Sequence, residues 1–189
     1  HDAGKIVVSS NSFTWNTGCG NYALGAAAAQ DTMLTLAEFG AYDAMAKQAD
    51  ERANTFPYTL EVWAAGNYKV TTQNIDDIRS GNSGNDACGV GTAPPENPNC
   101  RCQEDYKGGL DQIAFAALAK NVLTVGSVDE DSHASSSFSS SGPVDNGRVK
   151  PDIVAVGGNV YSCNDGHGYA TKDGTSMATP SISGAAALL

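Results

Sequence analysis

Ser176 is the residue whose neighbours in the sequence most suggest chemistry. It lies in the run Gly174-Thr175-Ser176-Met177-Ala178-Thr179-Pro180, at the start of an alanine-rich stretch that predicts a helix over Ser176–Leu189. A serine in the first turn of such a helix lies beside backbone N–H groups without helical partners, at the positive end of the helix dipole. That setting would stabilise an oxyanion formed when a hydroxyl attacks a carbonyl group. A helix N-cap explains the serine equally well, so the residue type alone leaves both interpretations open.

The elements that would position Ser176 alternate between strand and helix. Short β-branched runs predict strands over Lys5–Ser10 and Thr59–Ala65. Apolar residues at helical spacing predict a helix between them, over Thr32–Ala53, which Pro57 stops. Because a strand, a helix and a strand in this order favour a parallel sheet, we predict an α/β fold. It would have three layers, with a mostly parallel β-sheet and helices on both faces.

The second half of the chain continues this alternation. Helical composition over Leu110–Lys120 is followed by predicted strands over Val122–Val128 and Ile153–Val156. The serine-rich run Ser135–Ser141 is, by composition alone, typical of a flexible linker. Pro180 falls in the first turn of the predicted last helix, where a helix tolerates proline.

Residues 74–109 differ from the rest of the chain. They hold Gly, Asn, Asp, Pro and three of the five cysteines, with almost no apolar periodicity. A segment this long is not an ordinary connection, so we predict a surface insertion stapled by disulfides. The cysteines allow up to two disulfides and one remaining thiol, and they favour a secreted, extracellular protein. They are Cys19, Cys88, Cys100, Cys102 and Cys163.

Metal binding receives little support from the sequence. Cys100-Arg101-Cys102 lacks the spacing of a zinc site, so no metal ligand is assigned, and no cofactor is required. Structural calcium is possible, because an Asx-rich loop in the insertion offers hard oxygen ligands, although such loops mostly form turns. Its acidic and amide residues are Asn74, Asp76, Asp77, Asn82, Asn85 and Asp86.

Acidic side chains outnumber basic ones, which narrows the classes of partner. The chain has 189 residues, 21 of them Asp or Glu and 11 Lys or Arg, for a net charge of −10. Binders of nucleic acid and of anionic membranes need clustered positive charge, so neither partner is predicted. No apolar run reaches the roughly 18 residues that a membrane-spanning helix needs. The hydrophobic content of 41% is enough for a sizeable core.

Four blocks of the sequence, taken in order, resemble the subtilisin-like serine proteases, the subtilase family (peptidase S8). GTSMATP resembles the nucleophile motif of that family, and Ala64-Ala65-Gly66-Asn67 resembles the strand end that presents an oxyanion-hole asparagine. Residues 119–126 resemble the family's K-N-V-x-T-V-G strand. Residues 137–143 and 147–155 resemble its F-S-S-x-G-P and K-P-D-I-V-A segments. The matches run from about Lys5 to Leu189, interrupted by the insertion, so one partial subtilase catalytic domain is expected over residues 1–189.

The resemblance implies a role for each matching residue. Ser176 would attack a peptide carbonyl and form an acyl-enzyme, with its own N–H and the Asn67 side chain holding the oxyanion. Asn11-Ser12-Phe13-Thr14 resembles the strand that pairs with an extended protein or peptide substrate. Ser12, Phe13 and Thr14 would form one wall of the pocket for the residue before the scissile bond. Ala64, Ala65 and Gly66 would form the other wall.

Two departures from the family pattern shape what we expect of this chain. Thr14 stands where the family usually has glycine, so that wall would be narrower or differently shaped. The D-T/S-G and H-G-T-H blocks that carry the catalytic aspartate and histidine have no match. In the family's order they would fall before His1, along with the first strands of the sheet. An exposed loop histidine is the favoured interpretation for His1, His133 and His167.

Three function classes follow. The leading hypothesis is a serine-type endopeptidase whose isolated 189-residue chain is inactive for want of aspartate and histidine. The second is a catalytically dead subtilase-like module that grips extended peptides without cutting them. An α/β-hydrolase requires G-x-S-x-G, and Gly174-Thr175-Ser176-Met177-Ala178 fails at its last position.

Overall fold

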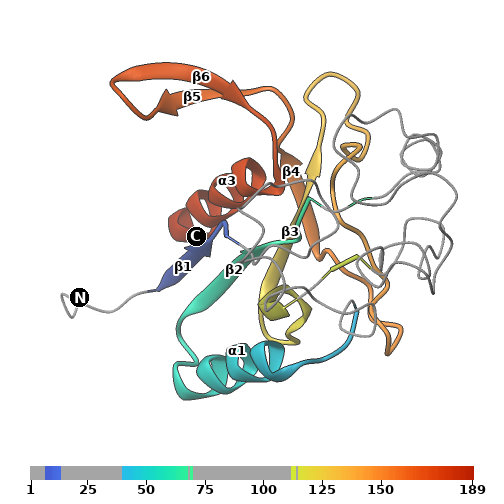
Figure 1. The fold of residues 1–189 in the computed structure, drawn as a ribbon. Coiled ribbons are helices and arrows are strands. Elements are labelled where there is room, and N and C mark those ends of the chain that lie inside the picture. The colour runs from blue at the N-terminus through green and yellow to red at the C-terminus, as the bar shows by residue number, and fades with distance from the viewer. Residues whose placement is uncertain (1–6, 14–39, 68, 70–111, 114) are drawn as a thin grey trace, which may run out of the picture.

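Four parallel strands form the centre of the protein (Figure 1). The computed structural model describes residues 7–13, 40–67, 69, 112–113 and 115–189. Within them, each strand pairs with the next along the chain, so the order in the sheet is β1-β2-β3-β4 and every pair is parallel. The predicted mostly parallel sheet is confirmed. The strands are β1 (Val8–Asn11), β2 (Leu60–Ala64), β3 (Leu123–Val128) and β4 (Ile153–Val156).

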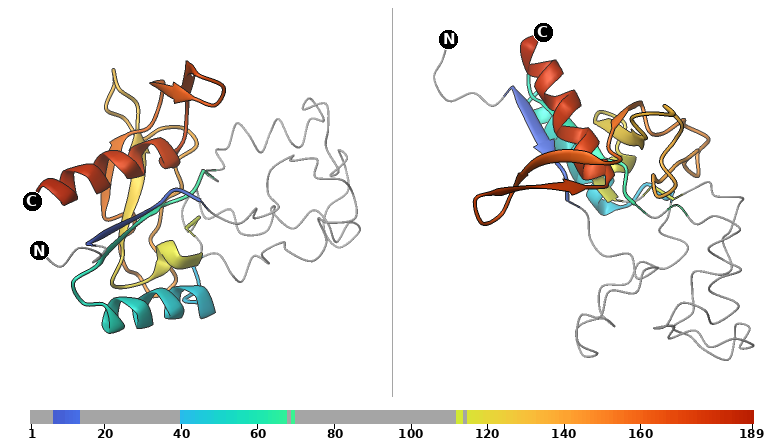
Figure 2. Two further views of the ribbon diagram at one scale, coloured as in Figure 1. Left: turned by 90° about the vertical axis from the view of Figure 1, so that its left-hand side faces the viewer. Right: turned by 90° about the horizontal axis from the view of Figure 1, so that it is seen from above.

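Helices cover both faces of this sheet, as the sequence predicts. Helix α3 (Thr175–Leu188) lies along one face and contacts all four strands. Helix α1 (Ala44–Thr55) lies on the opposite face with the short 3-10 helix η3 (Phe115–Leu118), which contacts β2 and β3. Figure 2 shows the strands lying between α1 and α3. The result is the three-layer α/β arrangement.

The alternation of side chains along β2 and β3 explains why both faces are covered. Successive side chains of a strand point to opposite faces of the sheet. Val62 and Val125 therefore pack with Ala178 of α3, whereas Trp63 packs with Ala46 and Ala49 of α1. All six residues are buried. A strand that is buried on both faces is mostly apolar rather than alternating, as Val62, Trp63 and Ala64 of β2 are.

Helix α1 is shorter than the helix predicted over Thr32–Ala53. Asp43 is its N-cap, and the Asp43 Oδ1 atom accepts a hydrogen bond of 2.7 Å from the Ala46 N–H. Gly40 has a φ of 71°, which lies outside the helical region. The apolar spacing before residue 40 therefore does not extend α1, and residues 32–39 lie outside the described part of the chain.

Two further predictions are corrected. Within the described part of the stretch Leu110–Lys120, the helical segment is η3 rather than a full helix, because Phe115 begins it with a φ of 60°, outside the right-handed helical region. The serine-rich run is not a flexible linker. Ser136 and Ser140 are fully buried and Ser139 is 2% exposed, so these hydroxyls belong to the packed interior.

A two-stranded antiparallel hairpin was not predicted. It consists of β5 (Val160–Asn164) and β6 (Gly168–Lys172), and it projects from the sheet just before α3 (Figure 1). The rings of Tyr161 and Tyr169 stack on it with centroids 5.5 Å apart. Cys163, on the same hairpin, is an exposed free cysteine.

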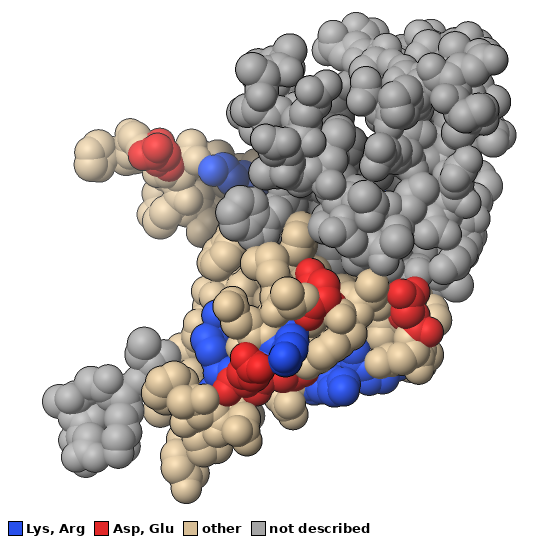
Figure 3. All heavy atoms as spheres, turned by 60° about the horizontal axis from the view of Figure 1, so that its bottom comes forward, with Lys and Arg blue, Asp and Glu red and all other residues tan. Residues whose placement is uncertain are grey.

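Charged side chains of both signs mix on the face that carries α1 (Figure 3). Lys47 and Glu51 form an exposed pair there with an Nζ–Oε1 distance of 3.7 Å. None of the helices described by the structure has the length and hydropathy to cross a membrane. The predicted insertion at 74–109, its calcium candidates and the other four cysteines lie outside the described residues.

Gly157 is where the loop after β4 meets the residues that precede α3. The Gly157 carbonyl accepts a hydrogen bond of 2.8 Å from the Gly174 N–H. A Cβ atom at Gly157 would lie 2.5 Å from Ser127 Oγ and 2.6 Å from the Gly174 carbonyl oxygen. Because one of these neighbours is backbone, no larger residue fits without moving the start of α3.

We therefore expect Gly157→Ala to lower the free energy of unfolding by about 1–3 kcal/mol through overpacking. Gly184→Ala is the matched control, since Gly184 lies in α3 and an added Cβ there would meet nothing within 4 Å. That control should stabilise the protein by about 0.5–1 kcal/mol, because alanine favours helix. Urea unfolding of both variants checks the prediction, and equal effects would contradict it.

Candidate active site

Ser176 lies in the first turn of α3, at the end of the sheet where β1 and β2 terminate. The N-cap residue of α3 is Gly174, so the interpretation of Ser176 as an N-cap is wrong. The Ser176 hydroxyl instead donates a hydrogen bond of 2.9 Å to the backbone carbonyl of Ser12, which follows β1. The side chain is thus partly buried and held against a neighbouring strand end.

Asn67 caps α3 from a distant part of the sequence. Its Oδ1 atom accepts hydrogen bonds from the backbone N–H and the hydroxyl of Thr175, each 2.9 Å long. Two donors can share only the oxygen of an amide, so the Asn67 NH₂ group must point the other way. Within the described residues no acceptor pairs with that NH₂ group, and Asn67 is exposed.

Two N–H donors meet beside Gly174. A Cβ atom placed on Gly174 would lie 3.3 Å from Asn67 Nδ2 and 3.6 Å from the backbone nitrogen of Ser176. Among the described residues, no group accepts a hydrogen bond from the Ser176 N–H either, as is usual in a first helical turn. Gly174 has a φ of 151°, which also favours glycine there. An anion beside Gly174 would therefore face two N–H donors that no other described residue engages, together with the positive end of α3.

A sequence model of the subtilase family (peptidase S8) matches residues 3–189. The chain belongs to the subtilase family. Its relatives include serine protease AprX of Bacillus subtilis (strain 168), which is 40% identical over 97 residues that cover 41% of this chain and 22% of AprX. Subtilisin BL of Lederbergia lenta is 42% identical over 81 residues, which cover 43% of this chain and 28% of that protein.

The chain thus spans less than a third of the length of these subtilases. Among solved structures, the prenylagaramide maturation protease PagA matches with a TM-score of 0.50 and 22% identity. That match covers 79% of this chain and 38% of PagA. It supports the subtilisin-like fold.

The structure brings together some of the subtilase-motif residues that the sequence singles out. Ser12 contacts Ser176, as described, and Phe13 follows it with 62% of its surface exposed. The Phe13 ring meets the Trp63 ring edge to face, with centroids 5.3 Å apart. Thr14 lies outside the described residues, so its effect on the pocket stays a prediction.

The second predicted wall lies at the end of β2. Ala64 and Ala65 are 5% and 3% exposed, and Gly66 is also buried. The Gly66 N–H donates to the Thr175 hydroxyl at 3.2 Å, and its carbonyl accepts from the Ser140 N–H at 3.0 Å. These backbone groups of Gly66 are therefore committed within the protein, and the wall role of all three residues stays a prediction.

No catalytic base lies within reach of Ser176 in the part of the chain that the structure describes. His133 follows β3 and His167 lies in the hairpin turn between β5 and β6; both are exposed, and neither bonds to the Ser176 hydroxyl. His1 lies outside the described residues. No group of three or more His, Cys, Asp or Glu residues among those described could hold a metal ion.

Sequence reasoning missed the buried hydroxyl groups behind the site. The Ser127 and Ser136 Oγ atoms are 2.8 Å apart, and the Ser136 hydroxyl donates to Asp129 at 2.8 Å. Since Ser136 donates to Asp129, Ser127 donates to Ser136. The Ser139 hydroxyl accepts from the Ser127 N–H at 2.9 Å. Ser127 lies against Gly157, so this network supports the residues that lead into α3. In the sequence, the F-S-S-x-G-P segment was the signal that could have pointed to these buried hydroxyls.

A second missed group joins α1 to β2. The Arg52 guanidinium binds both oxygens of the buried Glu61 carboxylate, at 2.9 and 2.8 Å. Burial alone would raise the pKa of Glu61, but hydrogen bonds from Arg52 and Trp63 lower it below its ordinary value. Glu61 is therefore ionised at neutral pH. A charge inside an apolar strand was the signal in the sequence.

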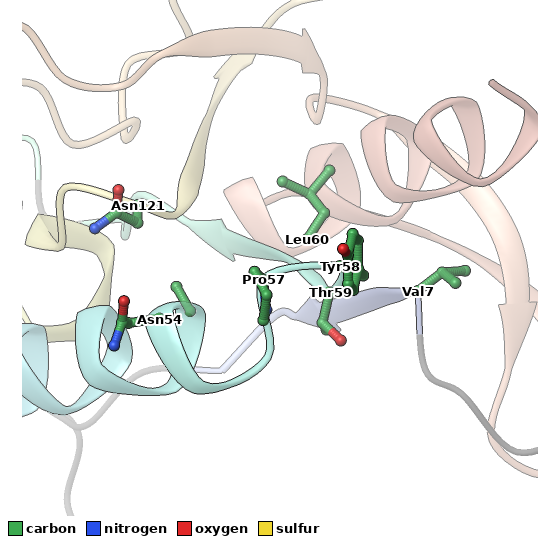
Figure 4. Close-up of a pocket in the computed structure, with 8 residues that line it drawn as sticks. Val7, Asn54, Pro57, Tyr58, Thr59, Leu60 and Asn121 are labelled. Carbon is green, nitrogen blue, oxygen red and sulfur yellow. The ribbon is translucent and has the colours of Figure 1, made fainter.

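A surface pocket lies at the opposite end of the sheet from Ser176 (Figure 4). It has a volume of about 510 Å³ and lies between the end of α1 and the starts of β1 and β2. Tyr58 and Leu60 are among its lining residues, and Tyr58 is 91% exposed. Since the motif residues gather at the other end of the strands, this pocket is separate from the candidate site.

Thr175 offers a test of the geometry around Asn67. Thr175→Val keeps the shape of the side chain but removes the hydroxyl, which leaves the buried Gly66 N–H without its acceptor. We expect a loss of about 1–3 kcal/mol in the free energy of unfolding, the usual effect of an unsatisfied buried donor. Thr175→Ser keeps the hydroxyl and lacks one methyl group, which corresponds to about 0.8 kcal/mol. Denaturant unfolding compares the two variants, and a larger loss for Thr175→Ser would contradict this prediction.

Proposed function

We propose that this chain carries the nucleophile and the oxyanion hole of a serine endopeptidase. The observation that supports the proposal best is the pair of N–H donors beside Gly174, one from Asn67 and one from Ser176 itself, neither of which bonds to another described residue. An oxyanion hole needs donors that are already in place when negative charge develops. Membership of the subtilase family and the nucleophile-like position of Ser176 at a helix N-terminus point the same way.

In the proposed reaction, a base removes the Ser176 hydroxyl proton as Oγ bonds to the carbonyl carbon of a peptide. The carbonyl oxygen becomes an oxyanion beside the Asn67 NH₂ group and the Ser176 N–H. Collapse of this intermediate breaks the C–N bond, and the departing amine takes the proton from the base. Water then hydrolyses the acyl-enzyme on Ser176 by the same steps.

The base is the part of this mechanism that the described residues do not supply. The Ser176 hydroxyl hydrogen is donated to the Ser12 carbonyl at 2.9 Å, and that bond must break when a base engages it. We propose a histidine, oriented by an aspartate, from outside the described residues. No cofactor is needed for this chemistry. The alternative is a module that binds peptides without cutting them, which the absence of a base near Ser176 in the described residues would favour.

Ser176→Ala in the full-length protein tests the nucleophile. Loss of Oγ should abolish hydrolysis of a fluorogenic peptide while leaving peptide affinity largely unchanged, because the hydroxyl forms a bond only during reaction. The matched control is Ser181→Ala, an exposed serine on the same helix, which should keep full activity. Retained turnover in Ser176→Ala would remove Ser176 from the mechanism. If the unmodified protein binds peptides but cleaves none, the binding module is the correct function.

Asn67→Ala tests the oxyanion hole. Removing one preorganised donor should lower kcat about 10²–10³-fold with little change in KM. Because alanine also removes the acceptor for Thr175, Asn67→Asp is the informative partner: it keeps an oxygen for Thr175 and lacks the N–H donors. Steady-state kinetics should show a loss at least as large for Asn67→Asp. Near-normal activity in that variant would mean that Asn67 acts only by holding α3.

A further inference from the structure

An ion pair with one buried partner lies behind the exposed ring of Phe13: the Glu61 side chain is buried, whereas the Arg52 side chain is 47% exposed. Glu61 is 8% exposed within a parallel strand whose neighbouring positions are apolar, and its carboxylate is held by Arg52 of α1. Burying a carboxylate in this way adds little to stability compared with an apolar side chain, because the carboxylate loses its hydration. The position of Glu61 inside the strand therefore calls for a reason other than stability.

The third partner of Glu61 is the indole of Trp63. The Trp63 Nε1–H donates to Glu61 Oε2 at 3.0 Å, from two residues further along the same strand. Indole has only this one donor, so the bond fixes which way the ring lies. Glu61 in turn cannot rotate freely, because Arg52 holds both of its oxygens in a fork. Arg52, Glu61 and Trp63 thus form a rigid chain of contacts, which we call the indole clamp.

The indole clamp ends at the candidate active site. The fixed Trp63 ring meets Phe13 edge to face, at 5.3 Å and an interplanar angle of 67°. Phe13 follows Ser12, whose carbonyl contacts the Ser176 hydroxyl. Trp63 is 8% exposed and Phe13 is 62% exposed, so the pair offers one open aromatic ring supported by a buried one. Since Arg52 neutralises Glu61, the surface they offer is apolar rather than anionic.

We propose that the indole clamp is a specificity device: Arg52 and Glu61 position Trp63 and, through it, Phe13 to receive an aromatic or large aliphatic substrate side chain. That side chain lies on the N-terminal side of the scissile bond. This inference rests on the proposed function, which supplies the substrate: a peptide that extends past Ser176. Glu61 and Arg52 touch no substrate and are positioning residues, whereas Phe13 makes the contact.

The test measures kcat/KM of the full-length protein on pairs of peptides. The two peptides of a pair differ only in having phenylalanine or alanine at one of the four positions before the scissile bond. In the unmodified enzyme kcat/KM should favour phenylalanine at one of these positions. In Glu61→Gln, which loses the charge that Arg52 binds, that preference should fall about three- to tenfold, the range that one aromatic contact provides. The change should appear in KM. Trp63→Phe, which keeps a ring but has no N–H donor, should reduce the preference similarly.

Glu51→Gln is the matched control, because Glu51 lies on α1 in an exposed pair with Lys47 and leaves the indole clamp intact. The Glu51→Gln variant should prefer the phenylalanine peptide over the alanine peptide by the same factor as the unmodified enzyme. A merely structural role for Glu61 would lower activity on both peptides by the same factor. An unchanged preference, or such a uniform loss, overturns the proposal.

A binding measurement separates this proposal from the proposed function. Peptide affinity is measured by isothermal titration calorimetry with the full-length protein. If the protein cleaves nothing, the proposed function fails, yet the phenylalanine-to-alanine ratio of affinities still tests the indole clamp. The ratio should fall in Glu61→Gln and stay constant in Glu51→Gln. A ratio that is the same in all three proteins overturns the inference.

Discussion

The structure of the site depends on one hydrogen-bonding arrangement, in which Asn67 caps helix α3. Gly174, the N-cap residue of α3, has no side chain to satisfy the first N–H groups of the helix. Asn67, 108 residues earlier in the chain, accepts from the Thr175 N–H in its place. The same bonds fix the orientation of the Asn67 amide and tie α3 to the end of β2. A single side-chain oxygen therefore sets both the position of the helix and the direction of the Asn67 NH₂ group.

Glycine at two positions allows this arrangement to form. Gly157 lets the loop after β4 approach the Gly174 carbonyl, and Gly174 leaves open the space between the Asn67 and Ser176 nitrogens. The buried hydroxyls of Ser127 and Ser136 fill the region behind Gly157. The site is thus built from close backbone approach and satisfied buried polar groups, which is how a set of donors is held rigid before a reaction.

The sequence predicts the sheet better than it predicts the connections between its strands. The predicted positions of β2 and α3 agree with the structure to within one residue at each end. Apolar spacing placed the start of the helix too early for α1, because the Asp43 cap decides that α1 begins at Ala44. Pro180 lies inside α3 rather than in its first turn, since the helix begins at Thr175. The links from Asn67 to Thr175 and from Arg52 to Trp63 are tertiary contacts, and local pattern carries no signal for their geometry.

The distance in sequence between the partners at Ser176 has a consequence for how the molecule assembles. Ser176 contacts Ser12 across 164 residues, and Thr175 contacts Asn67 across 108 residues. Contacts this far apart form late, because a long loop must close before they can stabilise anything. During synthesis Ser176 leaves the ribosome after every strand of the described sheet. The contacts of Ser12 with Ser176 and of Asn67 with Thr175 therefore cannot form until all four strands of the described sheet have been synthesised.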